Sequence, residues 1–308
     1  MNRPSNKSFN IDLIEVLFLL WSSKVLIIFL TSIFAVSSVF YTLSLQNLYK
    51  SETIAAVFSE SGQSLQSQYG GIAAIAGISL PSSGGVDKSA LIQKTITSRD
   101  FVQHLISIDE NFLPNLMAIK EYDKSNKIII LDEEIYRSSD KSWIRPPVNG
   151  NIIPSFLEAH KAYMNVIGFS QEKISRIISI SVEHQSPEFA HNLLLLMLKE
   201  LNNVIKNKDL SEAESSIEYL NNQLSLVSQA DIRKSINILI EAQLKKLMLV
   251  NVKEYYILQP LDLPYIPEEK SNPPRALICI IGTIFGFILT VSFVLIRHYF
   301  FINPKNSL

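Results

Sequence analysis

Two long apolar runs, one near each end of the chain, dominate its pattern of hydrophobic and polar positions. Residues 25–45 and residues 276–296 each contain 21 residues with no Asp, Glu, Lys, Arg or His side chain. A helix of this length spans about 31 Å, close to the roughly 30 Å hydrocarbon core of a bilayer. We therefore predict two transmembrane helices. A cleaved signal peptide at the first run and a buried core helix at the second are the alternatives.

Two spans place both tails, residues 1–24 and 297–308, on one side of the membrane and residues 46–275 on the other. The tails carry five Lys or Arg residues, against three on the far flanks of the spans. Because cytoplasmic flanks are enriched in Lys and Arg, we expect cytoplasmic tails and a periplasmic domain. A bacterial inner-membrane protein with two spans is the resulting hypothesis.

The segment between the runs begins with β-type and then helical patterns. Residues 49–60 predict a strand, whereas the uncharged, Gly- and Ser-rich residues 61–85 indicate a flexible loop or a segment that packs on a neighbouring subunit or the membrane surface. Apolar spacing over 87–108 predicts two short helices, the second capped by Ser98. A weakly structured loop is expected over 111–151.

Helical spacing returns at residues 152–169, which predict an amphipathic helix through Phe156, Ala159, Tyr163 and Val166. Alternating apolar residues over 174–182 then predict a strand. After it, Ser186 is the expected N-cap and Pro187 the first residue of a helix that continues to about Val227.

This predicted helix would be about 60 Å long, more than one small domain can cover. Its apolar positions have the 3–4–3 spacing of a coiled-coil seam and are Ile217, Leu220, Leu224 and Val227. We expect partner helices to cover this seam, from this chain or from a neighbour. A break near residues 228–231 would precede a last helix, capped by Asp231, whose apolar positions are Ile232, Ile236, Ile240, Leu244 and Leu247.

The chain returns to the second run through a predicted strand within 252–263 and a proline-rich segment, residues 260–274. Proline fixes the backbone and favours an extended connection, so this segment is expected to be stiff near the membrane. The prolines concerned are Pro264, Pro267, Pro273 and Pro274.

The second run contains a G-x-x-x-G pair, Gly282 and Gly286. Such pairs allow close helix packing in lipid, although they also arise by chance. The expected partners are the first span, through Ser32, Ala35 or Ser38, or the same span of a neighbouring subunit.

Motifs for catalysis or cofactor binding are missing from the sequence. It contains no Walker or G-x-G-x-x-G loop and no G-x-S-x-G motif, so no cofactor is expected. His184 and His191 are seven residues apart, unlike a helical zinc pair, and the acidic run 132–134 is typical of a solvated loop. A net charge of −1 without a basic block argues against nucleic acid as a partner.

Several segments together resemble the polysaccharide chain length determinant proteins, also called Wzz-type polysaccharide co-polymerases. The similar segments are IDLIEVLFLLWSSK with the following span, YKSETIAAVF, SRDF, ISISVEHQSPEFAHNLLLLMLKEL, EAQLKKLMLVN and NPPRALICIIGTIFGFIL. Their order covers nearly the whole chain, although no single motif is specific and residues 111–151 offer little to compare.

The resemblance implies an α+β membrane protein in which two transmembrane helices flank a periplasmic α+β domain with a long helical extension. It also implies a homo-oligomer, in contact with membrane lipid, that sets the length of a polysaccharide such as lipopolysaccharide O-antigen. The implied partners are a separate membrane polymerase and its lipid-linked polysaccharide. Some members of the family carry a tyrosine kinase, whereas this chain is similar to the kinase-free type. A kinase on a separate chain is an alternative that the sequence leaves open.

Two other functions remain open at this stage. A two-span periplasmic sensor or adaptor would need a cytoplasmic output element, for which tails of 24 and 12 residues are short. A membrane-bound glycan hydrolase would need two carboxylates facing each other across a cleft, which the sequence alone cannot arrange in space.

Overall fold

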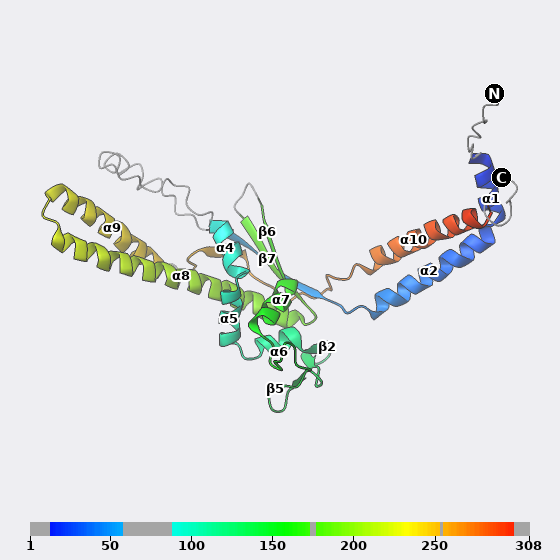
Figure 1. Ribbon diagram of the computed structural model, residues 1–308, viewed down its shortest axis with the longest axis horizontal. Helices are drawn as coiled ribbons and strands as arrows, with labels where there is room; N and C mark the ends of the chain where they lie inside the picture. Colours follow the sequence, from blue (N-terminus) through cyan, green and yellow to red (C-terminus); the bar gives the residue numbers. More distant parts are fainter. Residues whose placement is uncertain (1–12, 58–87, 173–176, 253–254, 299–308) are drawn as a thin grey trace, which may run out of the picture. The chain divides into compact units, whose positions relative to one another are not determined.

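The computed structural model describes residues 13–57, 88–172, 177–252 and 255–298 of the chain (Figure 1). These residues belong to two units: one contains the chain ends up to Asn47 and from Ser271, and the other spans Leu48–Lys270. The small-residue segment 61–85 lies outside the described residues. The predicted mixture of helices and strands, with two apolar helices and one long helix, is confirmed.

The unit that contains the chain ends is helical. It consists of α1 (Leu13–Ser22), α2 (Lys24–Ser44) and α10 (Arg275–Ile296), and α2 and α10 lie side by side (Figure 1). By length and composition, α2 and α10 could each cross a membrane. Their bounds differ by one residue from the predicted spans, whereas α1 falls in a region where only a tail was expected.

A four-stranded sheet forms the base of the second unit. Its strands are β1 (Tyr49–Val57), β6 (Ile167–Gln171), β7 (Ile177–His184) and β8 (Leu258–Asp262), in the order β6-β7-β1-β8 with every pair antiparallel. Alternate residues of β7 are buried, with Ile178, Ile180 and Val182 facing the core. The period of two seen in the sequence therefore reports one buried and one more exposed face.

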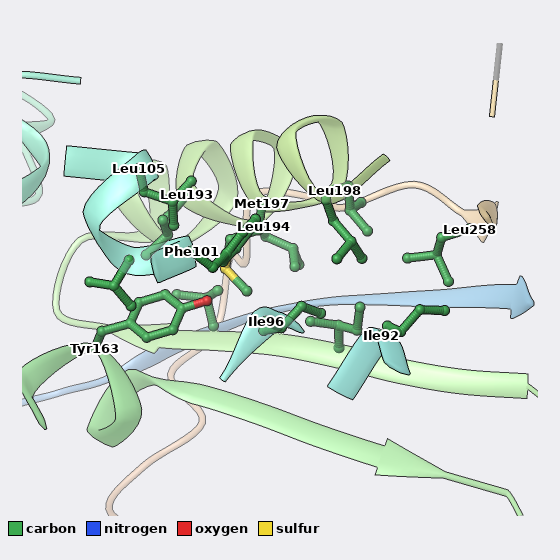
Figure 2. Packing of buried hydrophobic residues seen from close by; sticks show 14 of the residues in the cluster. Ile92, Ile96, Phe101, Leu105, Tyr163, Leu193, Leu194, Met197, Leu198 and Leu258 are labelled. Atoms are coloured by element: carbon green, nitrogen blue, oxygen red, sulfur yellow. The ribbon is translucent and has the colours of Figure 1, made fainter. Parts of the chain in front are cut away.

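Helix α8 (Pro187–Leu226) packs its N-terminal half on β1 and β7. Ser186 caps it as predicted, because the N–H of Phe189 donates to Ser186 Oγ at 3.1 Å. Side chains of this half enter the core with those of the helices α4 (Lys88–Ile96), α5 (Arg99–Ile108) and α7 (Phe156–Val166) (Figure 2). The fully buried residues include Ile92, Leu105, Tyr163, Leu194, Met197 and Leu201.

The two helices predicted over 87–108 are confirmed as α4 and α5. Ser98 caps α5, since its Oγ accepts a hydrogen bond from the N–H of Phe101 at 3.1 Å. Ser155 and Glu158 form a capping box at the start of α7. That helix ends at Val166, and the residues after it belong to β6, so the predicted helix over 152–169 was too long and its Phe156 is 51% exposed.

The expectation of a loop over 111–151 was wrong. This region contains α6 (Phe112–Met117), a hairpin of β2 (Ile119–Asp123) and β3 (Ile128–Leu131), and a second hairpin of β4 (Tyr136–Arg137) and β5 (Ser142–Trp143). Asp123 Oδ1 accepts hydrogen bonds from the N–H groups of Ser125 and Asn126, which closes the first turn. These strands are short and pair with their neighbours along the chain. The apolar run Ile128–Leu131 is therefore too short to show the alternation that identifies a strand.

Helix α9 (Ala230–Val252) runs back along the distal half of α8 (Figure 1). The break lies at residues 227–229, close to the predicted position. Asp231 does not cap α9, because the helix begins one residue earlier and Asp231 lies in its first turn. Of the predicted apolar face, Ile236 is buried and Ile240 and Leu247 are half-buried, whereas Ile232 and Leu244 are exposed, so only part of that face is covered.

Candidate packing surfaces of the apolar helices and the long helix

The G-x-x-x-G pair of α10 lies against α2. A Cβ atom placed on Gly282 would be 2.8 Å from Cβ of Ser38, and one placed on Gly286 would collide with Phe34 Cβ and Cγ. Real side chains do not approach so closely, so these two positions accept only glycine without a shift of one helix. Ser38 was among the expected partners of the pair, whereas Phe34 was not.

Polar side chains inside the two apolar helices bond within the protein. Thr42 Oγ1 and Cys279 Sγ are 3.6 Å apart across the α2–α10 pair. Thr290 Oγ1 donates to the carbonyl of Gly286 at 2.7 Å, and Ser32 Oγ donates to the carbonyl of Ile28. These bonds leave the outer faces of the pair apolar, as a helix in lipid requires.

Arg275 joins the beginning of α10 to the end of α2. Its Nη2 donates to the carbonyl of Leu45 and to Oδ1 of Asn47, both at 3.1 Å. The last carbonyl groups of a helix carry partial negative charge and lack partners in their own helix. The guanidinium of Arg275 therefore stabilises the end of α2 where the two helices meet.

The predicted seam of α8 lies in the part of the helix that α9 accompanies. Its four residues are all half-buried: Ile217, Leu220, Leu224 and Val227. Other apolar side chains of this hairpin are exposed, among them Tyr219 at 63% and Leu226 at 75%. Helix α9 is thus the partner from this chain, and contact of the hairpin with other subunits stays a prediction.

A polar clamp fixes the chain that follows α9 to α8. Asn202 is buried in α8, and its Oδ1 accepts hydrogen bonds from the N–H groups of Tyr256, Ile257 and Leu258 at 3.0–3.2 Å. About two turns further along α8, Asp209 accepts hydrogen bonds from the hydroxyl of Tyr256 at 2.5 Å and from Nζ of Lys246 at 3.1 Å. The role of these residues was not predicted from the sequence, because an Asn or Asp in the middle of a helix gives no periodic signal.

The predicted prolines have different surroundings. Pro264 and Pro267 are buried in the unit that contains the sheet, whereas Pro273 is half-buried and Pro274 is exposed next to α10. The first pair therefore packs against the protein, and only the second pair lies directly before the apolar helix. Their combined role as a stiff connection stays a prediction.

The residues considered for catalysis or metal binding lie apart. The carboxylate of Asp132 accepts a hydrogen bond from the N–H of Glu134 in an exposed turn. His184 is buried at the end of β7 and contacts Phe189, whereas His191 lies on α8. Within the described residues, no group of three or more His, Cys, Asp or Glu side chains could hold a metal ion.

His184 has a strongly altered protonation equilibrium. Burial lowers the pKa of His184 to about 4, and a backbone group of Asn115 offsets part of this effect. The N–H of Ser186 donates to Nδ1 of His184 at 3.2 Å. The ring is therefore neutral at physiological pH and supports the turn between β7 and α8.

An open groove of 440 Å³ lies between α4, α5 and α8. It is lined by Lys94, Thr95, Ser98, Asp100, Phe101, His104 and Val204. Nε2 of His104, one of these residues, is 2.9 Å from Oε2 of Glu200. This pair connects α5 to α8.

Comparisons with known proteins show that part of the chain matches a protein family. Residues 10–108 match the model of the Wzz family, described as chain length determinant protein. The match includes α2, β1, α4 and α5, and it confirms for these residues the resemblance predicted from the sequence. Among curated proteins, no sequence matches the chain significantly.

One solved structure, named "full-length bacterial polysaccharide co-polymerase", is similar over 96% of this chain and 100% of its own. The identity is 11% and the TM-score is 0.40.

Proposed function

We propose that this chain controls the length of a bacterial surface polysaccharide, such as lipopolysaccharide O-antigen, as a Wzz-type chain length determinant. The observation that carries the proposal is the family match over residues 10–108, which begins before the first apolar helix and ends with α5. The second apolar helix, α10, supports a two-span arrangement, and the excess of Lys and Arg in the tails supports a periplasmic location of the sheet-containing unit in an inner-membrane protein.

In this proposal the protein acts without catalysis, as a homo-oligomeric scaffold for a separate membrane polymerase and its lipid-linked polysaccharide. The long α8–α9 hairpin offers an extended surface with exposed apolar side chains, among them Tyr219, Leu226 and Met248. Patches of this kind on a protein surface are typical of contacts with other protein chains. The packed pair of α2 and α10 would anchor each subunit in lipid.

Deletion of the gene tests the proposal directly. We expect the distribution of surface-glycan lengths on a gel to change from a preferred length to a monotonic decline, and we expect the chain supplied in trans to restore the preferred length. An unchanged distribution would contradict the proposal and favour a two-span sensor instead. Glycan turnover by the purified protein would favour the hydrolase.

A further inference from the structure

An apolar strip begins in the last residues of strand β8 and continues past its end, with its large side chains exposed. Its members are Leu261, Leu263, Tyr265 and Ile266, which are 59%, 61%, 54% and 49% exposed. The two prolines between and after them, Pro264 and Pro267, are buried. The usual arrangement is therefore inverted, since the largest apolar side chains of this segment face outward.

The strip is held firmly by the sheet. The hydroxyl of Ser51 donates to the carbonyl of Tyr265 at 2.8 Å, and the hydroxyl of Thr53 donates to the carbonyl of Asp262 at 2.5 Å. Both hydroxyl side chains come from the buried face of β1, where Ser51 is 0% and Thr53 is 1% exposed. The outward direction of the strip is thus built into the fold.

The chain length between the strip and the apolar helices limits how far the strip can lie from a membrane. Ser51 follows the end of α2 at Ser44 by seven residues, which span at most about 25 Å when fully extended. Ile266 precedes the start of α10 at Arg275 by nine residues, or about 32 Å. The strip is therefore tethered on both sides to the helices that would enter the bilayer.

We propose that the apolar strip Leu261–Ile266 docks on the lipid surface next to the two apolar helices. Tyr is enriched at the membrane–water interface, where its ring lies among the headgroups and its hydroxyl reaches water. The buried prolines add to the fit, because proline has no N–H group that would need a partner near lipid. The exposed carboxylate-bearing Asp262 limits the strip to shallow insertion.

The residues around the strip favour apolar attraction to lipid over attraction to anionic headgroups. The exposed residues after the strip, Glu268, Glu269 and Lys270, carry two negative charges and one positive charge. A segment that sought anionic headgroups would instead carry several Lys or Arg residues. The attraction is therefore apolar, and it does not depend on lipid charge.

Site-directed spin labelling of the full chain in phosphatidylcholine vesicles tests this proposal. Cys279→Ser removes the single cysteine, and Leu263→Cys or Tyr265→Cys then provides one label site each, on side chains that are already exposed. We expect both labels to collide more with oxygen, which concentrates in lipid, than with a water-soluble nickel chelate. The same result is expected when phosphatidylglycerol is added to the vesicles.

Two matched labels make the outcome decisive. Asn222→Cys on α8 should collide mainly with the nickel chelate, whereas Ile284→Cys on the outer face of α10 should collide mainly with oxygen. The proposal rests on α10 lying in lipid, but not on the glycan role. If the labels at positions 263 and 265 collide mainly with the nickel chelate while the label at 284 collides with oxygen, lipid docking of the strip is overturned but the membrane arrangement stands. If the label at 284 also collides mainly with the nickel chelate, the membrane arrangement of α10 is overturned as well.

A second copy of the chain is the competing occupant of the strip. It would protect the labels at 263 and 265 from both oxygen and nickel and would broaden their spectra by spin–spin contact. That result would overturn lipid docking.

Discussion

Gly286 of α10 lies directly against the side chain of Phe34 in α2, so close that a Cβ atom at position 286 would overlap Phe34 Cβ and Cγ. One turn earlier, a Cβ atom at position 282 would lie 2.8 Å from Cβ of Ser38. The packing of the two apolar helices therefore depends on the absence of a side chain at two positions of α10.

We predict that Gly282→Leu with Gly286→Leu separates α2 from α10 while leaving membrane insertion intact, because Leu is more apolar than Gly. Overpacking of this kind costs about 1–3 kcal/mol. Thr42→Cys places a thiol next to Cys279, since Thr42 Oγ1 and Cys279 Sγ are 3.6 Å apart. The disulfide formed on oxidation should be lost or slowed in the double leucine variant.

Leu43→Cys is the matched control, because Leu43 is 61% exposed on the next position of α2. It should form little disulfide in either background. If the proposed function holds, the double leucine variant should also loosen the oligomer in detergent and broaden the distribution of glycan lengths. Unchanged crosslinking through Thr42→Cys would mean that the two glycines are incidental.

The seam of α8 carries the second prediction. Leu220→Asp with Leu224→Asp introduces two charges at half-buried positions of the α8–α9 hairpin, which is unfavourable without a partner cation. We expect a smaller assembly by light scattering and a shift in glycan length. Asn221→Asp with Asn222→Asp serves as the control, since both side chains are polar and exposed on α8 and should tolerate two added charges. The same assembly in all three proteins would show that the seam faces nothing important.

The sequence was sufficient where one local signal decides the structure. Ser98 and Ser186 were predicted as N-caps from their position before an apolar period, and each accepts the expected hydrogen bond. The two apolar helices follow from length and composition alone. In these cases the determining interactions lie within a few residues along the chain.

It failed where the outcome depends on tertiary contacts. The run Ile128–Leu131 forms a strand only because it pairs with β2, and four consecutive aliphatic residues do not distinguish a strand from a loop or a helix. Phe34 as the neighbour of Gly286 depends on the rotation of two helices about their axes. Asn202 became recognisable only once Tyr256, Ile257 and Leu258 were seen to donate to it.

Topology is the third prediction. A reporter that is active only in the cytoplasm should be active when fused after Leu308 and inactive when inserted near Ser125. The structure makes the second site suitable, because Ser125 lies in the turn between β2 and β3, away from the core. The opposite pattern of activity would contradict the periplasmic location of the sheet-containing unit.

A buried hydroxyl provides the fourth prediction. Tyr163 is 0% exposed, and among the described residues its hydroxyl has no hydrogen-bond partner. Burial also raises the pKa of the Tyr163 hydroxyl, because the charged form is not solvated there. Tyr163→Phe removes an unsatisfied polar group and should raise the free energy of unfolding by about 1 kcal/mol. Urea denaturation followed by Trp143 emission, with Trp21→Phe in every protein compared, measures this change.

Tyr256→Phe is the matched control for Tyr163→Phe. Its hydroxyl donates to Asp209 at 2.5 Å, so its removal should lower the free energy of unfolding by about 1 kcal/mol or more. A loss of stability in Tyr163→Phe similar to that in Tyr256→Phe would indicate that the Tyr163 hydroxyl is bonded in solution.

The last prediction concerns the pH dependence of stability. Burial lowers the pKa of His184 from its usual value of 6.5 to about 4, so between these pH values the unfolded chain binds a proton that the folded chain does not. Stability therefore falls as the pH decreases from about 6.5 toward 4, by at most about 1.4 kcal/mol per pH unit from this residue. Above pH 6.5 both states are neutral at this position, and the effect is absent.

His184→Gln should remove this part of the pH dependence, although the variant is expected to be less stable overall because the ring fills a buried site against Phe189. The quantity to compare is the slope of unfolding free energy against pH between 6.5 and 4.5, measured by urea denaturation at each pH. A His184→Gln protein with the parental slope would show that other groups, and not the neutral ring of His184, determine the loss of stability in acid.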